Sequence, residues 1–220
     1  MSTVKWSYSG LKDYINCPRQ YHEVKVLKNF TKEATQQMLY GTVVHRALED
    51  YVKDGAPLAK NYLVYKDMMD TILQIPGVRY PEHHMALDED KNPCSFKAKE
   101  YWVRGIADLL VIDGDTAYIV DYKTGSNRYA DPKQLRLMAL MAFAHFPEIQ
   151  TIKAGLLFVA HNSFLDEVYE REEKDNLWQS FDLDLMRLKN SIDTDKWVAN
   201  PTPLCGWCPV KKCEFHKVRR

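Results

Sequence analysis

Residues 118–125 read Tyr-Ile-Val-Asp-Tyr-Lys-Thr-Gly, and the rest of the chain is best interpreted outward from them. The first three are apolar and β-prone, which predicts a short buried strand. Asp121 and Lys123 follow two positions apart, a spacing that places both side chains on one face of a strand. The closing Thr-Gly pair is typical of a turn. The stretch therefore predicts a carboxylate and an ammonium group together at a strand end, as a plain ion pair or as part of a catalytic site.

A second strand is predicted over residues 101–112, which are rich in aromatic and β-branched residues. It carries Asp108 among apolar neighbours, where an unpaired charge is costly. The Asp-Gly-Asp sequence at 113–115 is a turn signal and predicts a hairpin between the two strands. We expect this hairpin to bring Asp108 close to Asp121 and Lys123.

Helices are predicted on both sides of this hairpin in the sequence. The helix over 35–53 carries His45 in its middle, and the helix over 132–145 carries Gln134 in its first turn. Taken alone, His45 is more often a core histidine than a metal ligand. The other expected helices cover residues 11–27, with a break at Cys17-Pro18, 61–73 and 172–191, and the other expected strands cover residues 77–87, 151–160 and 164–169. Helices before and after a mixed sheet predict an α/β fold with the site on the sheet.

Size and charge limit the classes of function. The chain of 220 residues is long enough for one sizeable domain, which we expect to span residues 1–220. Its 30 basic and 30 acidic residues balance, so bulk charge gives no general attraction to nucleic acid, and any attraction must come from local patches such as residues 211–212 and 217–220. No apolar run approaches the roughly 20 residues that cross a bilayer. The N-terminal residues lack the apolar core of a signal peptide, and we expect a cytoplasmic protein with no membrane partner.

The cysteines point to a metal site. Their odd number, five, argues against a disulfide framework. Cys205, Cys208 and Cys213 lie close together in a loop rich in proline and glycine, which lets three thiolates converge on one ion. A fourth ligand is needed, and the candidates are Cys17, Cys94 and His216. Zinc would accept either a cysteine or His216, whereas ligation by cysteines alone suits zinc or an iron–sulfur cluster.

Taken together and in this order, these elements resemble the PD-(D/E)XK nuclease superfamily in its RecB-like branch. The elements are the helix with His45, the strand with Asp108, the strand with Asp121-Tyr122-Lys123 and the helix that opens near Gln134. The early Cys17-Pro18 pair and the closing cysteines look like the iron–sulfur members, which include AddB-type helicase-nucleases, CRISPR-associated exonucleases and phage relatives. The resemblance covers nearly the whole chain. It implies a restriction-endonuclease-like core with a cysteine-rich tail.

The resemblance also implies roles for single residues. The metal ligands for Mg²⁺ or Mn²⁺ would be His45, Asp108, Asp121 and the backbone carbonyl of Tyr122. Lys123 would orient the attacking water or stabilise developing charge, and Gln134 would support the site. Glu82 is compared with an acidic residue that some members carry on an earlier strand. Met138 stands where the family often has a tyrosine, which leaves the DNA-contacting role of that helix open.

In the iron–sulfur members one early cysteine joins three late ones. The resemblance therefore selects Cys17 with Cys205, Cys208 and Cys213 as ligands of a 4Fe–4S cluster, with zinc as the alternative. This cluster would join the N-terminal helix to the tail, residues 200–220. Cys94 would then be a free thiol.

The expected activity is that of a metal-dependent DNA exonuclease acting on single-stranded or duplex ends in DNA recombination, repair or processing, in a prokaryotic or phage-infected cell. The chain carries no Gly-x4-Gly-Lys-[Ser/Thr] motif, so a helicase would be a separate partner protein. One rival interpretation is a structure-specific or restriction-type DNA endonuclease, and another is a nuclease subunit active only with a partner. A third is a zinc-bound DNA-binding module without activity. The sequence leaves the oligomeric state open.

Overall fold

The computed structural model describes residues 4–126, 131–161 and 163–216, so the basic residues 217–220 lie outside the described part of the chain. The chain divides into two compact units. The first consists of residues 35–178, and the second combines residues 4–34 with residues from 179 onward. Within the described residues, no helix has both the length and the apolar composition that crossing a membrane requires.

The first unit is built on a six-stranded sheet with the strand order β2-β1-β3-β4-β5-β6. The strands are β1 (Val78–Leu87), β2 (Pro93–Cys94), β3 (Val103–Asp113), β4 (Thr116–Lys123), β5 (Thr151–Phe158) and β6 (Ser163–Glu170). The β4–β5 pair is parallel, and every other neighbouring pair is antiparallel. The predicted mixed sheet and the hairpin through residues 113–115 are confirmed, with Gly114 in the left-handed region at φ +61°.

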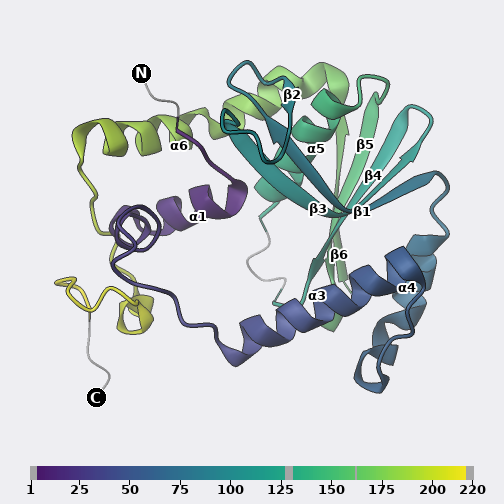
Figure 1. Cartoon of the computed structure of the whole chain (residues 1–220), viewed down its shortest axis with the longest axis horizontal. Coiled ribbons are helices and arrows are strands. Elements are labelled where there is room, and N and C mark those ends of the chain that lie inside the picture. The colour runs from purple at the N-terminus through teal and green to yellow at the C-terminus, as the bar shows by residue number, and fades with distance from the viewer. Residues whose placement is uncertain (1–3, 127–130, 162, 217–220) are drawn as a thin grey trace. The chain divides into compact units, whose positions relative to one another are not determined.

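Helices cover both faces of this sheet (Figure 1). The side chains of Val120 and Tyr122 on β4 pack into a core cluster with α3 (Gln36–Asp54) and α4 (Lys66–Leu73). Asp121 lies between them in sequence and instead contacts Gln134 of α5 (Lys133–His145). Because neighbouring residues of a strand point to opposite faces, α5 covers the face away from α3 and α4. Eight of the thirteen α5 residues are buried, which fits a helix against the sheet interior.

The helix boundaries follow local signals. Thr35 caps α3 by accepting the Met38 amide at 3.2 Å, and Gly55 ends that helix with φ +66°. The helix expected over residues 61–73 begins instead as a 3₁₀ segment, Lys60–Tyr65, and becomes α-helical only in α4. The 3₁₀ segment contains Asn, Val and two Tyr residues, all weak α-helix formers, which accounts for the tighter first turns.

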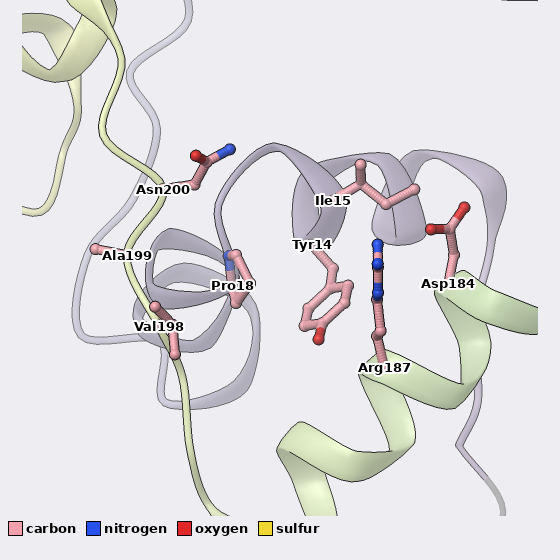
Figure 2. Close-up of a pocket in the computed structure, with 8 residues that line it drawn as sticks. All are labelled: Tyr14, Ile15, Pro18, Asp184, Arg187, Val198, Ala199 and Asn200. Atoms are coloured by element: carbon pink, nitrogen blue, oxygen red, sulfur yellow. The ribbon is translucent and has the colours of Figure 1, made fainter.

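The second unit gathers both ends of the described chain. It contains α1 (Tyr8–Asn16), α2 (Pro18–Tyr21), a π-helical turn (His22–Val26), most of α6 (Lys174–Thr194) and a 3₁₀ turn (Pro203–Trp207). The break expected at Cys17-Pro18 is present, because Cys17 is extended at φ −164°. Tyr14 and Ser191 share a hydrogen bond of 2.8 Å between their hydroxyls. This unit contains a cavity of about 290 Å³. Tyr14, Arg187 and Val198 are among the residues that line it (Figure 2).

Candidate active site

The site begins where β3 and β4 separate. Their ladder runs from the hairpin turn as far as the pair Leu109–Val120 and ends there, whereas β4 stays paired with β5 as far as Lys123. Two residues beyond Val120, the amide of Tyr122 donates instead to Asp108 Oδ2 at 2.7 Å. The Asp108 carboxylate thus replaces the backbone carbonyl that would accept this amide in a regular strand pair. It satisfies the buried amide and holds Asp108 beside the C-terminal end of β4.

Asp121 is the most buried member of the group, with 5% of its side chain exposed. Gln134 Nε2 of α5 donates to Asp121 Oδ1 at 2.5 Å. Asp121 Oδ2 forms an ion pair with Lys123 Nζ but accepts no hydrogen bond of ordinary geometry. Asp121 and Lys123, which their two-residue spacing predicted to share one face of a strand, are therefore in direct contact.

His45 reaches the same place from the middle of α3. Its Nδ1 lies 3.5 Å from Asp108 Oδ2, and its ring meets the ring of Tyr122 edge-on. Burial lowers the pKa of His45, and Asp121 opposes that shift only in part. The imidazole is therefore neutral near pH 7, the form that binds metal ions. Gly41, one turn earlier, allows this approach, because a Cβ there would lie 2.8 Å from Thr124 Oγ1.

Burial raises the pKa of Asp108 to about 8, and the negative charge of nearby Asp121 adds to the effect. The amide of Tyr122 and the ammonium of Lys123 act in the opposite direction without cancelling it. Ionising both carboxylates in this buried site is therefore costly unless a cation binds beside them.

Glu82 joins the site through an unusual backbone. It lies opposite Asp108 between the ladder pairs Pro81–Leu109 and His83–Ala107, and its φ is +48°, in the left-handed region. Its charge contributes to the raised pKa of Asp108. Residue patterns alone did not predict Glu82 at the site, because a positive φ at a glutamate has no sequence signature. Only the comparison with the family suggested this residue.

An open cavity of about 740 Å³ adjoins these groups. His45 and Glu82 line it, together with residues of α3 on one side and Thr124 and Gly125 on the other. Asp108, Asp121 and Lys123 are not among its lining residues, and Asp108 contacts the lining residue His45. The cavity therefore lies next to the residues that surround the buried carboxylates.

The donor set fits a hard divalent cation. Carboxylate oxygens and a neutral imidazole are suitable ligands for Mg²⁺ or Mn²⁺, and the buried Asp121 Oδ2 has an ion pair with Lys123 but no hydrogen bond. In the described part of the chain, no three His, Cys, Asp or Glu side chains already form a group that could hold a metal ion. Asp121 is instead paired with Lys123, so cation binding would require that ammonium to move.

Helix α5 contacts the site through Gln134, and most of its other residues pack in the core. Met138 is 4% exposed and packs against Gly105 of β3, where an added Cβ would lie 2.8 Å from Met138 Cε. Met138, which stands where the family often has a tyrosine, is therefore buried against the sheet. Gln134, one turn earlier, is the residue of this helix that contacts an acidic site residue.

The cysteines gather in the second unit. Cys17, Cys205, Cys208 and Cys213 line one small cavity. Three of the sulfurs accept N–H groups: Cys208 from Gln20 Nε2 at 3.2 Å, Cys205 from the Thr202 amide at 3.3 Å, and Cys17 from the Asn200 amide at 3.5 Å. These N–H groups therefore orient three of the four sulfurs.

The other two candidates for the fourth ligand differ in position. His216 lines the cysteine cavity, and its Nδ1 is buried without a hydrogen-bond partner. Cys94 lies on β2 in the first unit, where burial raises the pKa of its thiol. The structure therefore groups Cys17 and His216 with the three tail cysteines.

A mixed sheet that opens around paired carboxylates and a lysine defines a nuclease-like site. The family model of the PD-(D/E)XK nuclease superfamily matches residues 5–213, and the chain belongs to that superfamily. The predicted superfamily is confirmed, whereas the RecB-like iron–sulfur branch stays a prediction. Among curated proteins, no sequence matches the chain.

Solved structures share the fold. The crystal structure of SSO0001 aligns with a TM-score of 0.52 at 12% identity, covering 99% of this chain and 90% of that one. A candidate exonuclease from Eubacterium rectale aligns with a TM-score of 0.55 at 10% identity, covering 98% of this chain and 88% of that one. Identities this low show a common fold, and the roles of individual residues in this chain remain predictions.

Proposed function

We propose that this chain is a Mg²⁺- or Mn²⁺-dependent DNA exonuclease that hydrolyses phosphodiester bonds from strand ends. One observation carries the proposal: residues from three separate elements gather where β3 and β4 separate, with His45 against Asp108, Asp108 against the Tyr122 amide, and Lys123 against Asp121. The superfamily match and the fold shared with the Eubacterium rectale protein support it. DNA recombination, repair or processing is the expected setting.

Each residue has a definite part in this proposal. Asp108, Asp121 and His45 would hold the cation with the Tyr122 carbonyl, and the bound cation would neutralise phosphate charge and activate a water. Gln134 fixes the rotamer of Asp121 by donating to its Oδ1. The Tyr122 amide holds one oxygen of Asp108 and leaves the other for the cation. Lys123, once released from Asp121, places a positive charge beside the reacting phosphate.

The proposal is tested on three DNA substrates. Anaerobically purified protein is incubated with Mn²⁺ and with end-labelled single-stranded DNA, end-labelled duplex DNA or covalently closed circular DNA. An exonuclease degrades the linear molecules and leaves the circle intact. Cutting of the circle would favour the structure-specific or restriction-type endonuclease instead. Cleavage seen only after a helicase or recombination protein is added would favour the partner-dependent subunit, and failure under all conditions would overturn the proposal.

For the second unit we propose that Cys17, Cys205, Cys208 and Cys213 hold a 4Fe–4S cluster, which joins the N-terminal helix to the tail in one domain of 220 residues. The shared cavity and the N–H donors to three sulfurs support this ligand set. The cluster would act structurally, by cross-linking segments that are distant in sequence.

A zinc ion is the second candidate, and one observation favours it. His216 Nδ1 is buried beside the cysteines without a partner, and a zinc site of three cysteines and one histidine would satisfy it. The two candidates differ in whether Cys17 or His216 is required for metal content.

A further inference from the structure

A row of contacting aromatic and cationic side chains leads away from the active-site cavity, from β1 across the β2–β3 connection to β3. It starts at Glu82, which lines the cavity and lies 3.9 Å from His84 Nε2. The His84 ring packs against the Phe96 ring in a tilted arrangement, with centroids 4.4 Å apart and an angle of 32°. The Arg104 guanidinium lies 5.2 Å from the centre of the Phe96 ring and 4.6 Å from that of Tyr101. We call His84, Phe96, Tyr101 and Arg104 the aromatic–cationic row.

The row is accessible to solvent. About half of the His84 side chain is exposed, Arg104 is exposed, and Phe96 and Tyr101 are half-buried. The connection that carries Phe96 and Tyr101 also carries Lys97 and Lys99, and Glu100 is its one acidic residue between 95 and 104. Rings and positive charges thus alternate over a short exposed segment of a chain whose overall charge is balanced.

These features match one class of ligand. Unpaired nucleotides present flat bases that stack on aromatic rings and on guanidinium planes, and their phosphates are attracted by nearby cations. A duplex buries its bases in its own stack and offers mainly phosphates, so it would gain little from the rings. The row is continuous with the cavity through Glu82 and His84, so a strand lying along it would lead toward the carboxylates.

We propose that the aromatic–cationic row is a binding surface for single-stranded DNA, which holds the unpaired strand adjoining the bond to be cut. This inference rests on the proposed nuclease function and adds a strand preference to it. Phe96 and Tyr101 stack with bases, and Arg104 supports both rings while attracting the phosphate backbone.

Binding is measured without cleavage, by fluorescence anisotropy in EDTA with labelled oligo(dT) and with a labelled blunt duplex. Phe96→Ala and Arg104→Gln should weaken oligo(dT) binding by about tenfold each, the loss that follows when one stacked base loses its platform. Duplex binding should stay within about twofold. With Mn²⁺, the same variants should raise KM for single-stranded DNA and leave kcat unchanged.

The matched control is Phe164→Ala. Phe164 is 52% exposed and lies on β6, the edge strand opposite β2, so its removal should leave oligo(dT) binding unchanged. Tyr101→Phe keeps the ring and should also bind normally. If Phe96→Ala fails to fold, Phe96→Leu keeps the apolar volume without an aromatic face and should show the same loss.

Two results would overturn the inference. One is a folded Phe96→Leu protein that binds oligo(dT) as tightly as the parent, and the other is a parent that cleaves DNA without binding oligo(dT). A parent that cleaves no DNA in the three-substrate assay would instead remove the proposed function, which is a separate and distinguishable result.

Discussion

The carboxylate of Asp108 accepts the main-chain N–H of Tyr122 at 2.7 Å, at the first position where β3 no longer supplies a carbonyl to β4. One side chain thus completes the sheet and contributes to the site. Asparagine is nearly the same shape and can still accept this N–H through its amide oxygen, so the charge of residue 108 can be removed while the contact is kept.

Asp108→Asn should stabilise the metal-free protein in a pH-dependent way. Burial raises the folded-state pKa of the Asp108 carboxyl to about 8 from an ordinary value of 3.8. The folded state therefore binds this proton more tightly than the unfolded state. Stability is therefore lost as pH rises from about 4 to about 8, and the variant escapes this loss. We expect a melting temperature higher by at least about 2–4 °C near pH 8, the shift that 1 kcal/mol produces at this size. Thermal melts in EDTA should show no such gain near pH 4.

Asp121→Ala should abolish cleavage and leave the fold intact. Asp121 has a carboxylate oxygen, Oδ2, that is buried and lacks a hydrogen bond, so its loss removes an acceptor for the proposed cation. Cleavage of end-labelled DNA with Mn²⁺ should fall by more than about a hundredfold, as expected when a group needed in the transition state is lost. Asp113→Asn, at the exposed end of β3, is the control and should cut normally. Activity of Asp121→Ala within tenfold of the parent would refute the assignment.

His45→Ala separates a metal ligand from a core residue. If the imidazole binds the cation, the Mn²⁺ concentration needed for half-maximal cleavage should rise by about ten- to a hundredfold, the usual cost of weakening a metal site. If His45 is merely a packing residue, the melting temperature should fall while the Mn²⁺ dependence stays unchanged. A metal titration beside a thermal melt decides between these outcomes. His161, which is exposed, provides the matched His→Ala control.

Gly41 and Thr124 should be energetically coupled. Alanine at 41 is favoured by helix propensity but would place a Cβ 2.8 Å from Thr124 Oγ1, so α3 or the segment after β4 must shift. In a double-mutant cycle, Gly41→Ala should cost more with Thr124 present than in a Thr124→Gly background, by about 0.5–3 kcal/mol. Urea unfolding of the four proteins measures this difference. Additive effects would contradict the close approach of α3.

The cysteine proposal is tested by iron, sulfide and zinc analysis of four single variants. Under the 4Fe–4S proposal, Cys17→Ala and Cys208→Ala should lose iron and several degrees of melting temperature, whereas Cys94→Ala and His216→Ala should keep both. Under the zinc alternative, His216→Ala should lose the metal and Cys17→Ala should keep it. Full iron content in Cys17→Ala would remove Cys17 from the ligand set, while Cys94→Ala controls for loss of a half-buried thiol.

Much of the sheet could be predicted from sequence because its signals are local. Alternating and β-branched residues mark β3 and β4, and the Asp-Gly-Asp turn fixes the hairpin between them. The contact of Asp121 with Lys123 follows from their two-residue spacing on a strand. The proximity of Asp108 followed from the same hairpin, since it stands one residue beyond the last β3–β4 pair.

Other parts of the site depend on backbone geometry that sequence patterns do not encode. The separation of β3 and β4 after Leu109 has no sequence signal, and neither has the left-handed backbone at Glu82. The burial of Met138 against Gly105 depends on how α5 docks on the sheet. Likewise, His216 could be considered a ligand from sequence, but its unpartnered Nδ1 beside the cysteines is a tertiary feature.

The second unit is discontinuous in sequence, because residues 4–34 are completed only by residues after 178. During synthesis, the ribosome must deliver the whole first unit before residues 205, 208 and 213 exist. A nascent chain can therefore contain a folded sheet before the three tail cysteines, which we propose to act with Cys17, have been synthesised. Under the proposed cysteine–metal site, metal loading would be the last step of maturation, and a cell starved of that metal would accumulate chains with a folded core and unjoined ends.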